Sequence, residues 1–286
     1  MHRTDTTAST VLWISAHPEP SSLNGSLRRD GVEHLCRLGY TVVESDLYAM
    51  GWDPVVRAPD GGHVAGDEPG VFRVSIDTRD AYISGTQPAE IVDEQAKLRR
   101  ADAVVVQFPL WWYGMPAILK GWFDRVFVSG FAFGSDPATG RRLRFEQGPF
   151  VGKRALVVTT LGDRPHAIGP RGKSGELHEL LFGLLHGTFA YTGMSVLPPW
   201  ALPSADRITD YEIRIDNPKR RAVKAFQGLN YKVVAAGDSY NDTTMLLAAD
   251  AGFLFHAPDN VRAEFPQLPA FDDFDALLSA MQPHLS

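Results

Sequence analysis

The sequence predicts an α/β fold built around a parallel sheet, and two observations carry this prediction. Short apolar runs of strand length alternate with longer stretches of helical character between residues 10 and 200. Such alternation is typical of a parallel sheet with helices on both faces. With 286 residues and a hydrophobic content of 44%, the chain is also long enough to bury a full core.

Five strands and four helices are expected in this region. The strands are expected at 10–15, 40–45, 103–108, 154–160 and 194–197, and the helices near 24–37, 87–99, 116–128 and 175–190. Five strands suit the flavodoxin-like, doubly wound order 2-1-3-4-5, in which ligands bind beyond the carboxyl ends of the strands. Two polar segments, 51–86 and 134–149, are expected as long loops that wrap a cofactor or a second subunit.

The first expected strand is followed by a turn, 16–24, that contains Ser21 and Ser22 just before the first helix. Free backbone N–H groups and the positive end of the helix dipole favour a phosphate group at such a turn. Serine is also a common N-cap, and the turn taken alone favours capping over phosphate binding. Both interpretations are kept at this point.

The third expected strand continues into an aromatic loop. An apolar run, 103–106, precedes Pro109, Trp111, Trp112 and Tyr113. Such a loop at a strand end can form a wall for a flat ring system. The alternative is that these aromatic side chains belong to the core. Two adjacent tryptophans cannot both point into one face of a strand, so at least one is expected in a pocket.

The composition argues against several classes of function. The net charge is −6, from 28 basic and 34 acidic residues, and no basic stripe interleaved with aromatic residues occurs, so no nucleic-acid partner is expected. Cys36 is the single cysteine, which fits a reducing compartment. Polar residues and prolines interrupt the apolar stretch 103–119, and residues 1–9 lack the apolar core of a signal peptide. We therefore expect no membrane span and a cytoplasmic location.

The composition changes near 198–205, where three prolines stand close together. We expect a first domain at 1–203 and a second, smaller segment at 204–286. A doubly wound domain normally has a helix after its fifth strand, and Asn217-Pro218 is a good start for a helix at about 218–229. The second segment is therefore expected to dock on the first domain.

Four segments in family order, 16–24, 42–50, 107–127 and 159–162, resemble the NAD(P)H:quinone oxidoreductase family of DT-diaphorase-type flavoproteins. The resemblance covers residues 10–200 and implies an NAD(P)H dehydrogenase (quinone)-like flavoenzyme that reduces quinones or related small aromatic acceptors. Hydride would pass from NAD(P)H to the flavin and then to the acceptor, in ping-pong order. FAD is the implied cofactor, with FMN as the alternative. A homodimer with two shared active sites is implied as well.

The resemblance also implies roles for individual residues. The implied cofactor-binding residues are His17, Ser21, Ser22, Leu23, Asn24, Pro109, Leu110, Trp111, Trp112, Thr159, Thr160, Leu161 and Gly162. The implied substrate-binding residues are Trp112, Tyr113, Phe131 and Phe133. The implied catalytic set is Trp112, Tyr113, Gly162 and His166.

Several positions depart from the family pattern. Leu161 stands where glycine is usual, and Phe133 replaces a tyrosine. The family's tyrosine and histidine, which help to stabilise charge on the reduced flavin, align best with Ile168 and Ser174. His166 lies near this position but out of register, and a lone loop histidine is more often a surface residue. The group that moves protons is therefore the least determined part of the site.

Residues 206–286 resemble the carboxy-terminal part of haloacid-dehalogenase-type (HAD-type) phosphoserine/homoserine phosphotransferases. The resemblance lies in 217–220, in the Gly-Asp-x-x-Asn-Asp signature at 237–242 and in 251–258. In an intact enzyme of that kind, Lys219 would neutralise a phosphoryl group.

The same resemblance implies that Asp238 and Asp242 would help to hold Mg²⁺. Catalysis in that superfamily needs an aspartate nucleophile in an Asp-x-Asp arrangement near the start of the fold, and none precedes or begins this segment. We interpret the segment as a catalytically incomplete HAD-like remnant. No metal site is expected beyond residual Mg²⁺ binding at these two aspartates.

Three hypotheses about function follow. The first is the flavin-dependent NAD(P)H oxidoreductase, which requires that a flavin be bound and reduced. The second is a phosphate-handling enzyme in which the second segment works with a separate chain that supplies the nucleophile. The third is a flavin-binding module without catalytic activity.

Overall fold

The computed structural model describes residues 9–63, 71–208, 223, 227 and 231–285. The chain divides into two compact units, Met1–Ile208 and Thr209–Ser286, whereas the sequence placed the division after residue 203. The 217–220 motif, with Lys219, lies outside the described residues, as does most of the helix expected at 218–229. Docking of the second unit on the first stays a prediction.

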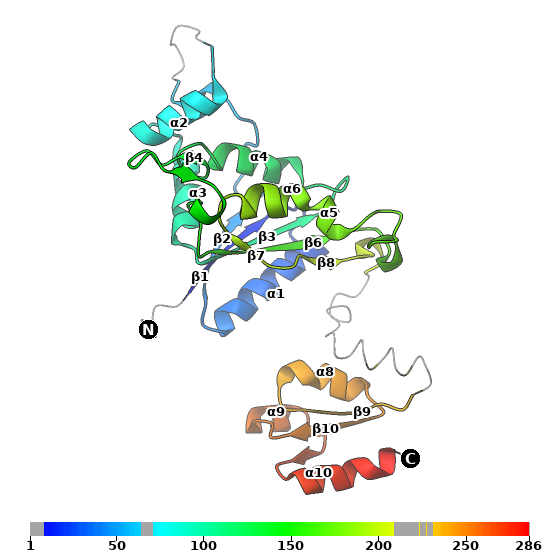
Figure 1. The fold of residues 1–286 in the computed structure, drawn as a ribbon. Helices are drawn as coiled ribbons and strands as arrows, with labels where there is room; N and C mark the ends of the chain where they lie inside the picture. Colours follow the sequence, from blue (N-terminus) through cyan, green and yellow to red (C-terminus); the bar gives the residue numbers. More distant parts are fainter. Residues whose placement is uncertain (1–8, 64–70, 209–222, 224–226, 228–230, 286) are drawn as a thin grey trace. The chain divides into compact units, whose positions relative to one another are not determined.

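The first unit contains a parallel sheet, as the sequence predicts. Its strands are β1 (Thr10–Ser15), β2 (Thr41–Asp46), β3 (Ala103–Pro109), β6 (Arg154–Thr160), β7 (Ser195–Val196) and β8 (Trp200–Leu202). Their order is β2-β1-β3-β6-β7, with β8 also paired to β6 (Figure 1). The α/β fold with a flavodoxin-like parallel sheet is confirmed, but the sheet has six strands instead of the expected five.

The extra strand arises because the last edge of the sheet is interrupted. β7 pairs with Arg154 and Ala155 at the start of β6, and β8 pairs with its end. Pro198 and Pro199 stand between β7 and β8. Proline has no N–H group to give to a ladder, so the edge cannot continue as one strand.

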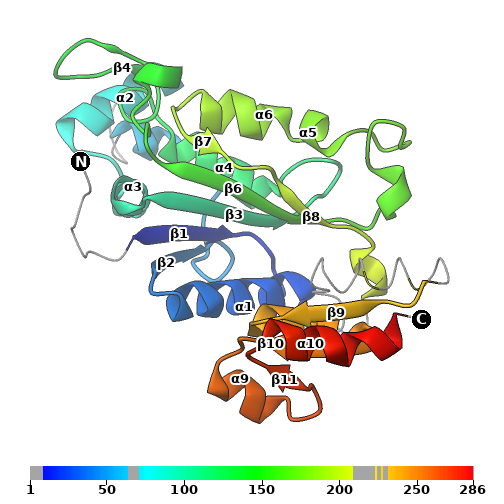
Figure 2. The ribbon, with the colours of Figure 1, turned by 60° about the horizontal axis from the view of Figure 1, so that its bottom comes forward.

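Helices cover both faces of this sheet. Figure 2 shows α1 (Leu23–Arg37) on one face and α4 (Ala117–Val126), α5 (Leu177–Leu180) and α6 (Phe182–Leu184) on the other. The stretch expected as one helix at 175–190 is divided into α5, α6 and the π-helix Leu185–Ala190 (η4). Gly183 and Gly187 lie in this stretch, and glycine is a poor residue for a continuous α-helix.

The polar segments expected as long loops carry structure of their own. Residues 51–86 include a 3-10 turn, Ala58–Gly61, and α2 (Val74–Ser84), and residues 134–149 include the hairpin of β4 (Gly134–Ser135) and β5 (Arg142–Leu143). The expectation of two plain loops was therefore wrong. Their low periodicity hid short elements that tertiary contacts stabilise.

One buried guanidinium holds the first of these segments in place. Arg125 of α4 is 6% exposed and donates to both carboxylate oxygens of Asp60, at 2.9 and 2.8 Å. It also donates to Glu90 of α3 (Ala89–Arg100) at 2.8 Å, and it lies over the ring of Trp52. These partners raise the pKa of Arg125 against the opposing effect of burial, so the charge is retained.

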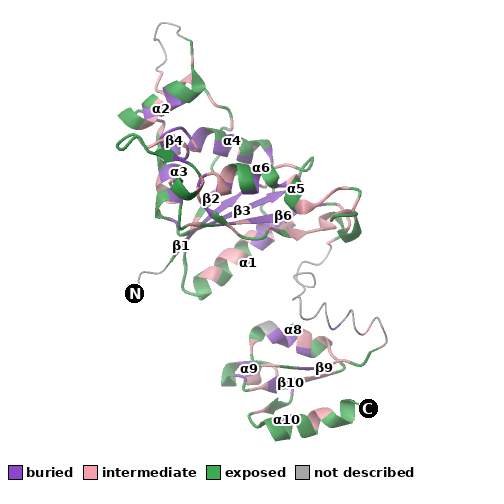
Figure 3. Ribbon diagram, in the orientation of Figure 1, coloured by how far each residue is buried: buried purple, intermediate pink, exposed green. Residues whose placement is uncertain are grey.

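The second unit is a smaller α/β arrangement. Its parallel strands have the order β11-β10-β9, with β9 at Val234–Gly237, β10 at Ala251–Phe255 and β11 at Ala270–Phe271. Its helices are α8 (Tyr240–Ala248), α9 (Asp259–Glu264) and α10 (Phe274–Met281). Figure 3 shows that buried residues are concentrated in the strands and α4 of the first unit and are sparser in the second.

Candidate active site

Three of the segments singled out in the sequence meet at the carboxyl edge of the first sheet. Ser15 of β1 is paired in register with Gln107 of β3, and Pro109 of β3 is paired with Thr160 of β6. The turn after β1, the aromatic loop after β3 and the residues after β6 therefore leave the sheet side by side. In a doubly wound sheet this is the edge at which ligands bind.

The turn after β1 is folded tightly onto the first turn of α1. Ser22 is the N-cap, and its Oγ accepts from the N–H of Gly25 at 3.2 Å. A Cβ on Gly25 would lie 1.9 Å from the carbonyl oxygen of Pro20, so a larger residue could not be accommodated. The capping role that the sequence left open for Ser22 is present, and the orientation of the helix leaves its positive end at this turn.

The donors of the other serine, Ser21, are hydrogen-bonded to a carboxylate within the turn. Glu19 accepts from both the N–H and the hydroxyl of Ser21. These two hydrogen bonds hold the pKa of Glu19 below its ordinary value. Ser21, which the sequence assigned to the cofactor, therefore has its donors engaged within the turn. His17 is bonded instead to Ser22, with Nδ1 and Oγ 2.9 Å apart.

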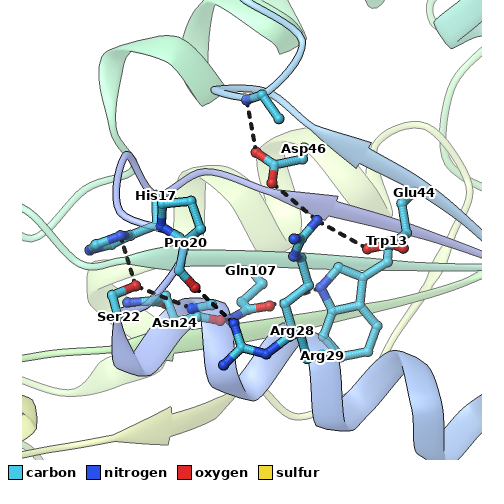
Figure 4. A network of polar contacts seen from close by, with 12 residues as sticks. Trp13, His17, Pro20, Ser22, Asn24, Arg28, Arg29, Glu44, Asp46 and Gln107 are labelled. Carbon is cyan, nitrogen blue, oxygen red and sulfur yellow. Dashed lines mark hydrogen bonds and ion pairs between the residues drawn. The ribbon is translucent and has the colours of Figure 1, made fainter.

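Asn24 is the buried polar group at the centre of this turn (Figure 4). It is 6% exposed, and its Nδ2 donates to Oγ1 of Thr160 on β6 at 2.9 Å. Its Oδ1 is buried and has no hydrogen-bond partner among the described residues. Asn24 and His17 border a small pocket of only about 10 Å³, which is close to the space of a single water molecule. The orphaned amide end is the observation that favours a polar ligand at the turn.

The aromatic loop is a tight turn with two residues in the left-handed region. Trp112 has φ 50° and Tyr113 has φ 57°, and the N–H of Gly114 donates to the carbonyl of Trp111 at 2.9 Å. Positive φ at both central positions is the type I′ geometry, which ordinarily takes asparagine and glycine. Large aromatic residues there are strained, and such strain is found where a loop serves a ligand or partner.

The three aromatic side chains of this turn lie in different environments. Trp112 is 99% exposed and projects into solvent, so it lines no pocket within the single chain, and its role at the flavin stays a prediction. Trp111 is half-exposed, and its ring centroid lies 6.3 Å from that of His17 across the mouth of the first turn. The hydroxyl of Tyr113 donates to Oγ of Ser174 at 3.1 Å, a contact over 61 residues that no motif indicated.

The remaining implied cofactor residues are mostly buried in the sheet edge. Pro109, Leu110, Thr159, Thr160 and Leu161 are all buried, and the Thr159 hydroxyl donates to the carbonyl of Phe108. Gly162 is exposed, and a Cβ added to it would meet nothing within 4 Å. His166 is an exposed residue of a 3-10 turn, Pro165–Ala167.

The two phenylalanines that were expected at a substrate pocket lie in different places. Phe131 is 4% exposed and packs between Tyr82 and Phe150 inside its own unit, so it is a core residue. Phe133 is half-buried and lines a cavity of about 680 Å³. The sequence could not distinguish them, because both belong to one Phe-Ala-Phe motif.

That cavity lies between α4 and the α5 to η4 stretch, beside the end of β3. Its lining is largely apolar and aromatic, and it consists of Phe108, Gly114, Met115, Lys120, Phe123, Asp124, Phe127, Phe133, Leu180, Leu181, Gly183, Leu184, Gly187, Thr188, Tyr191 and Thr192. Its volume is that of a typical small-molecule site. The sequence analysis missed it, because no motif marks a groove formed by two helices that pack from distant parts of the chain.

The second unit has its own cavity of about 680 Å³, which Asp238 and Asp242 border. Asp242 is 4% exposed, and its Oδ2 accepts from the N–H of Asp238 and the hydroxyl of Ser239, so it ties the loop after β9 to the first turn of α8. No group of three His, Cys, Asp or Glu side chains that could hold a metal occurs in the described part of the chain. One of the two expected Mg²⁺ ligands is thus engaged in hydrogen bonds to the loop before α8.

An Asp-x-Asp does occur later in this unit, at Asp273-Phe274-Asp275. Asp273 is the N-cap of α10, with its side chain accepting from the N–H of Ala276. The arrangement therefore begins a helix near the end of the chain and does not follow a first strand. It does not replace the missing nucleophile.

Within the ranges that the structure describes, the helices are too short or too polar for any of them to cross a bilayer.

Comparisons with known proteins agree with the first unit. Residues 9–225 match the family of the flavodoxin-like fold. The chain is 42% identical over 191 residues to human ribosyldihydronicotinamide dehydrogenase [quinone], covering 66% of this chain and 79% of that one. A solved structure from Klebsiella pneumoniae, assigned as a quinone reductase, is 40% identical with a TM-score of 0.67, over 79% of this chain and 86% of that one.

A separate part of the chain matches a different protein. It is 62% identical over 72 residues to phosphoserine phosphatase from Pseudomonas syringae, which is 25% of this chain and 30% of the phosphatase. Both resemblances drawn from the sequence are thereby confirmed, the second for a fragment only. On the match over residues 9–225, the chain belongs to the family of the flavodoxin-like fold.

Proposed function

We propose that this protein is a flavin-dependent NAD(P)H oxidoreductase that reduces quinones or related small aromatic acceptors. The observation that carries the proposal is the meeting of the α1 turn, the strained aromatic turn and the end of β6 at one sheet edge. The names of the relatives, a quinone dehydrogenase and a quinone reductase, give the reaction class.

The residues at this edge fit a flavin. The positive end of α1 suits the phosphate part of the cofactor, with His17 and Leu23 beside it. The amide of Asn24, whose Oδ1 has no partner, suits a phosphate oxygen when it is turned over so that its NH₂ group faces the ligand. Trp111 and the chain from Pro109 to Leu110 suit one side of a ring system, and the backbone from Thr159 to Gly162 suits its polar edge. FAD is the cofactor that we propose, with FMN as the alternative.

When bound, a flavin supplies two-electron hydride chemistry between NAD(P)H and the acceptor. The chain has to bind and orient it, to shield it from water and to leave room for a second flat molecule. We infer a ping-pong scheme in which the nicotinamide leaves before the acceptor enters. Tyr113, held by its hydrogen bond to Ser174, supplies the hydroxyl of the aromatic loop that we assign to either molecule. A Cβ on Gly162 would meet nothing within 4 Å, so the space at the end of β6 is open. His166 remains the candidate for proton movement.

We propose that the active form is a homodimer. Trp112 is fully exposed on a strained turn, and Phe133 lines the apolar cavity of about 680 Å³ beside α4. A second copy of the chain could cover both features and complete a shared pocket. Phe131 is buried in the core, so Phe133 is the phenylalanine of the Phe-Ala-Phe motif that can contact a substrate. Light scattering of the purified chain should give twice the mass of one chain, and a monomer at micromolar concentration would contradict this part.

A single purification tests the redox proposal. The full chain should be yellow, or should become yellow with added FAD, and NADPH or NADH should bleach it under anaerobic conditions. A quinone should then restore the colour. Protein that stays colourless with FAD and FMN contradicts the proposal, and bound flavin that neither nicotinamide reduces favours the non-catalytic flavin-binding module.

A second candidate is the phosphate-handling enzyme, favoured by the 62% identity of the shorter segment to a phosphatase. The engaged Asp242 and the absence of an early Asp-x-Asp in the sequence count against it. Hydrolysis of phosphoserine by the chain alone, with Mg²⁺ and at a rate abolished by Asp238→Asn, would establish it.

A further inference from the structure

We infer that Trp13 and Gln107 are positioning residues for the phosphate-binding turn, an inference that rests on the proposed flavin function. A chain of buried hydrogen bonds connects them to Asn24. Nε1 of Trp13 donates to Oε1 of Gln107 at 2.8 Å, and Nε2 of Gln107 donates to the backbone carbonyl of Asn24 at 2.6 Å (Figure 4). All three residues are at most 6% exposed.

The indole fixes the orientation of the glutamine amide. Trp13 can only donate, so the oxygen of Gln107 must face it and the NH₂ group must face Asn24. With the amide reversed, two donors would face each other and the carbonyl of Asn24 would face an oxygen. Trp13 on β1 therefore determines that Gln107, on the neighbouring strand β3, presents its NH₂ group to the backbone carbonyl of Asn24 in the first turn of α1.

Helix α1 is shaped to admit this indole. A Cβ on Gly31 would lie 2.3 Å from Cη2 of Trp13, so a glycine in the middle of the helix makes room for the ring. Glycine within a helix is less favourable than alanine, so the fold accepts a local loss of helix stability to place this residue. A core that needed only apolar filling would not require a glutamine at this point, since an unsatisfied amide is expensive to bury.

The far end of the chain of bonds faces the candidate site. Asn24 is held at its backbone by Gln107 and at its side chain by Thr160. Because the Thr160 hydroxyl can donate as well as accept, the Asn24 amide can turn over without losing this bond. Turning over would place its NH₂ group where the orphaned Oδ1 now lies, ready for an oxygen of a diphosphate. The fixed backbone then allows the side chain to respond to the ligand alone.

Binding to the full chain tests this inference. FAD affinity is measured by quenching of flavin fluorescence on protein from which flavin has been removed, and inorganic diphosphate affinity is measured by calorimetry. Trp13→Phe and Gln107→Met should each raise the Kd for both ligands by about tenfold, as loss of one well-placed hydrogen bond predicts. The double variant should be close to either single variant, because both break one chain of bonds.

Val105→Ala is the matched control, since Val105 packs in the same buried cluster as Trp13 but takes no part in the hydrogen bonds. It should lower the Tm while leaving both Kd values within about twofold of wild type. Equal Kd values for Trp13→Phe, Gln107→Met and wild type would overturn the inference, as would a control that weakens binding as much as they do.

The two ligands separate this inference from the proposed function. Wild-type protein that binds diphosphate but no flavin, with both variants weakened, would support the positioning role and contradict the redox proposal. Wild-type protein that binds neither ligand would overturn both.

Discussion

The two units of this chain differ in how complete they are. The second is the closer match by identity, at 62%, but it corresponds to only 30% of its relative. The first is 42% identical to its relative and corresponds to 79% of it. Of the largest fully buried side chains among the described residues, Leu246 and Leu254 alone belong to the second unit.

This contrast teaches that local identity and a working site are separate properties. The signature Gly237 to Asp242 is intact in the second unit, yet Asp242 is hydrogen-bonded to the loop before α8, and the sequence has no Asp-x-Asp before this segment. In the first unit, the site is assembled from three strand ends that a continuous sheet keeps in register. A site of this kind depends on the whole sheet and cannot persist in a fragment.

The largest expected effect tests how much the first unit depends on its buried polar groups. Arg125→Met should lower the free energy of unfolding by about 3–5 kcal/mol, because Asp60 is then left buried without its partner. Urea denaturation followed by tryptophan fluorescence measures this. The control is Arg262→Met in the second unit, whose pair with Asp272 is much more exposed and should contribute far less. Equal losses in the two variants would remove the contrast between the units.

The next effect concerns cofactor retention in the first unit. Asn24→Ala removes the amide with the unpartnered Oδ1 and its bond to Thr160, and it should weaken flavin binding by about 1–3 kcal/mol, or roughly fivefold to 150-fold. Equilibrium dialysis of FAD against the variant measures the change. Asn260→Ala, on α9 of the second unit, is a matched asparagine substitution that should leave retention as in wild type. If the Asn24→Ala variant binds FAD with the same affinity as wild type, Asn24 does not help to hold the phosphate.

A smaller effect is expected at the strained turn. Tyr113→Gly should relieve the left-handed strain at φ 57° and raise stability by about 1 kcal/mol, less the lost bond to Ser174. The same change should raise the KM for the quinone while kcat falls less. Calorimetry and steady-state rates measure the two changes. The control is Tyr231→Gly in the second unit, which should leave the KM for the quinone unchanged. A Tyr113→Gly variant with the wild-type KM would show that Tyr113 does not contact the acceptor.

The smallest effect is the most direct test of the remnant interpretation. Asp238→Asn should leave quinone reduction within about twofold of wild type, because Asp238 is exposed and contributes no group to the candidate site of the first unit. The rate with saturating NADPH measures this, with circular dichroism as the check on folding. A large loss of turnover in a folded variant would mean that the second unit takes part in the redox reaction.

The sequence could predict those features that local patterns determine. Continuous apolar runs gave β1, β3 and β6 within a residue or two, because strands buried on both faces need them. The signal at 16–24 was sufficient to locate the turn between β1 and α1, and Ser22 caps α1 as serine before a helix does. The order of the strands followed from the fold class, with β8 missed because a three-residue strand after two prolines gives no periodic signal.

Tertiary structure decided what each functional side chain does. The motif at 111–113 is the same aromatic sequence whether Trp112 points into a pocket or into solvent, and only the turn geometry decided for solvent. Phe131 packs in the core against Phe150, whereas Phe133, two residues later, lines the cavity beside α4. The bonds of Gln107 to Trp13 and Asn24 join residues more than 80 apart in the chain. Hydrogen bonds and burial depend on distances between such remote residues, and sequence spacing does not contain those distances.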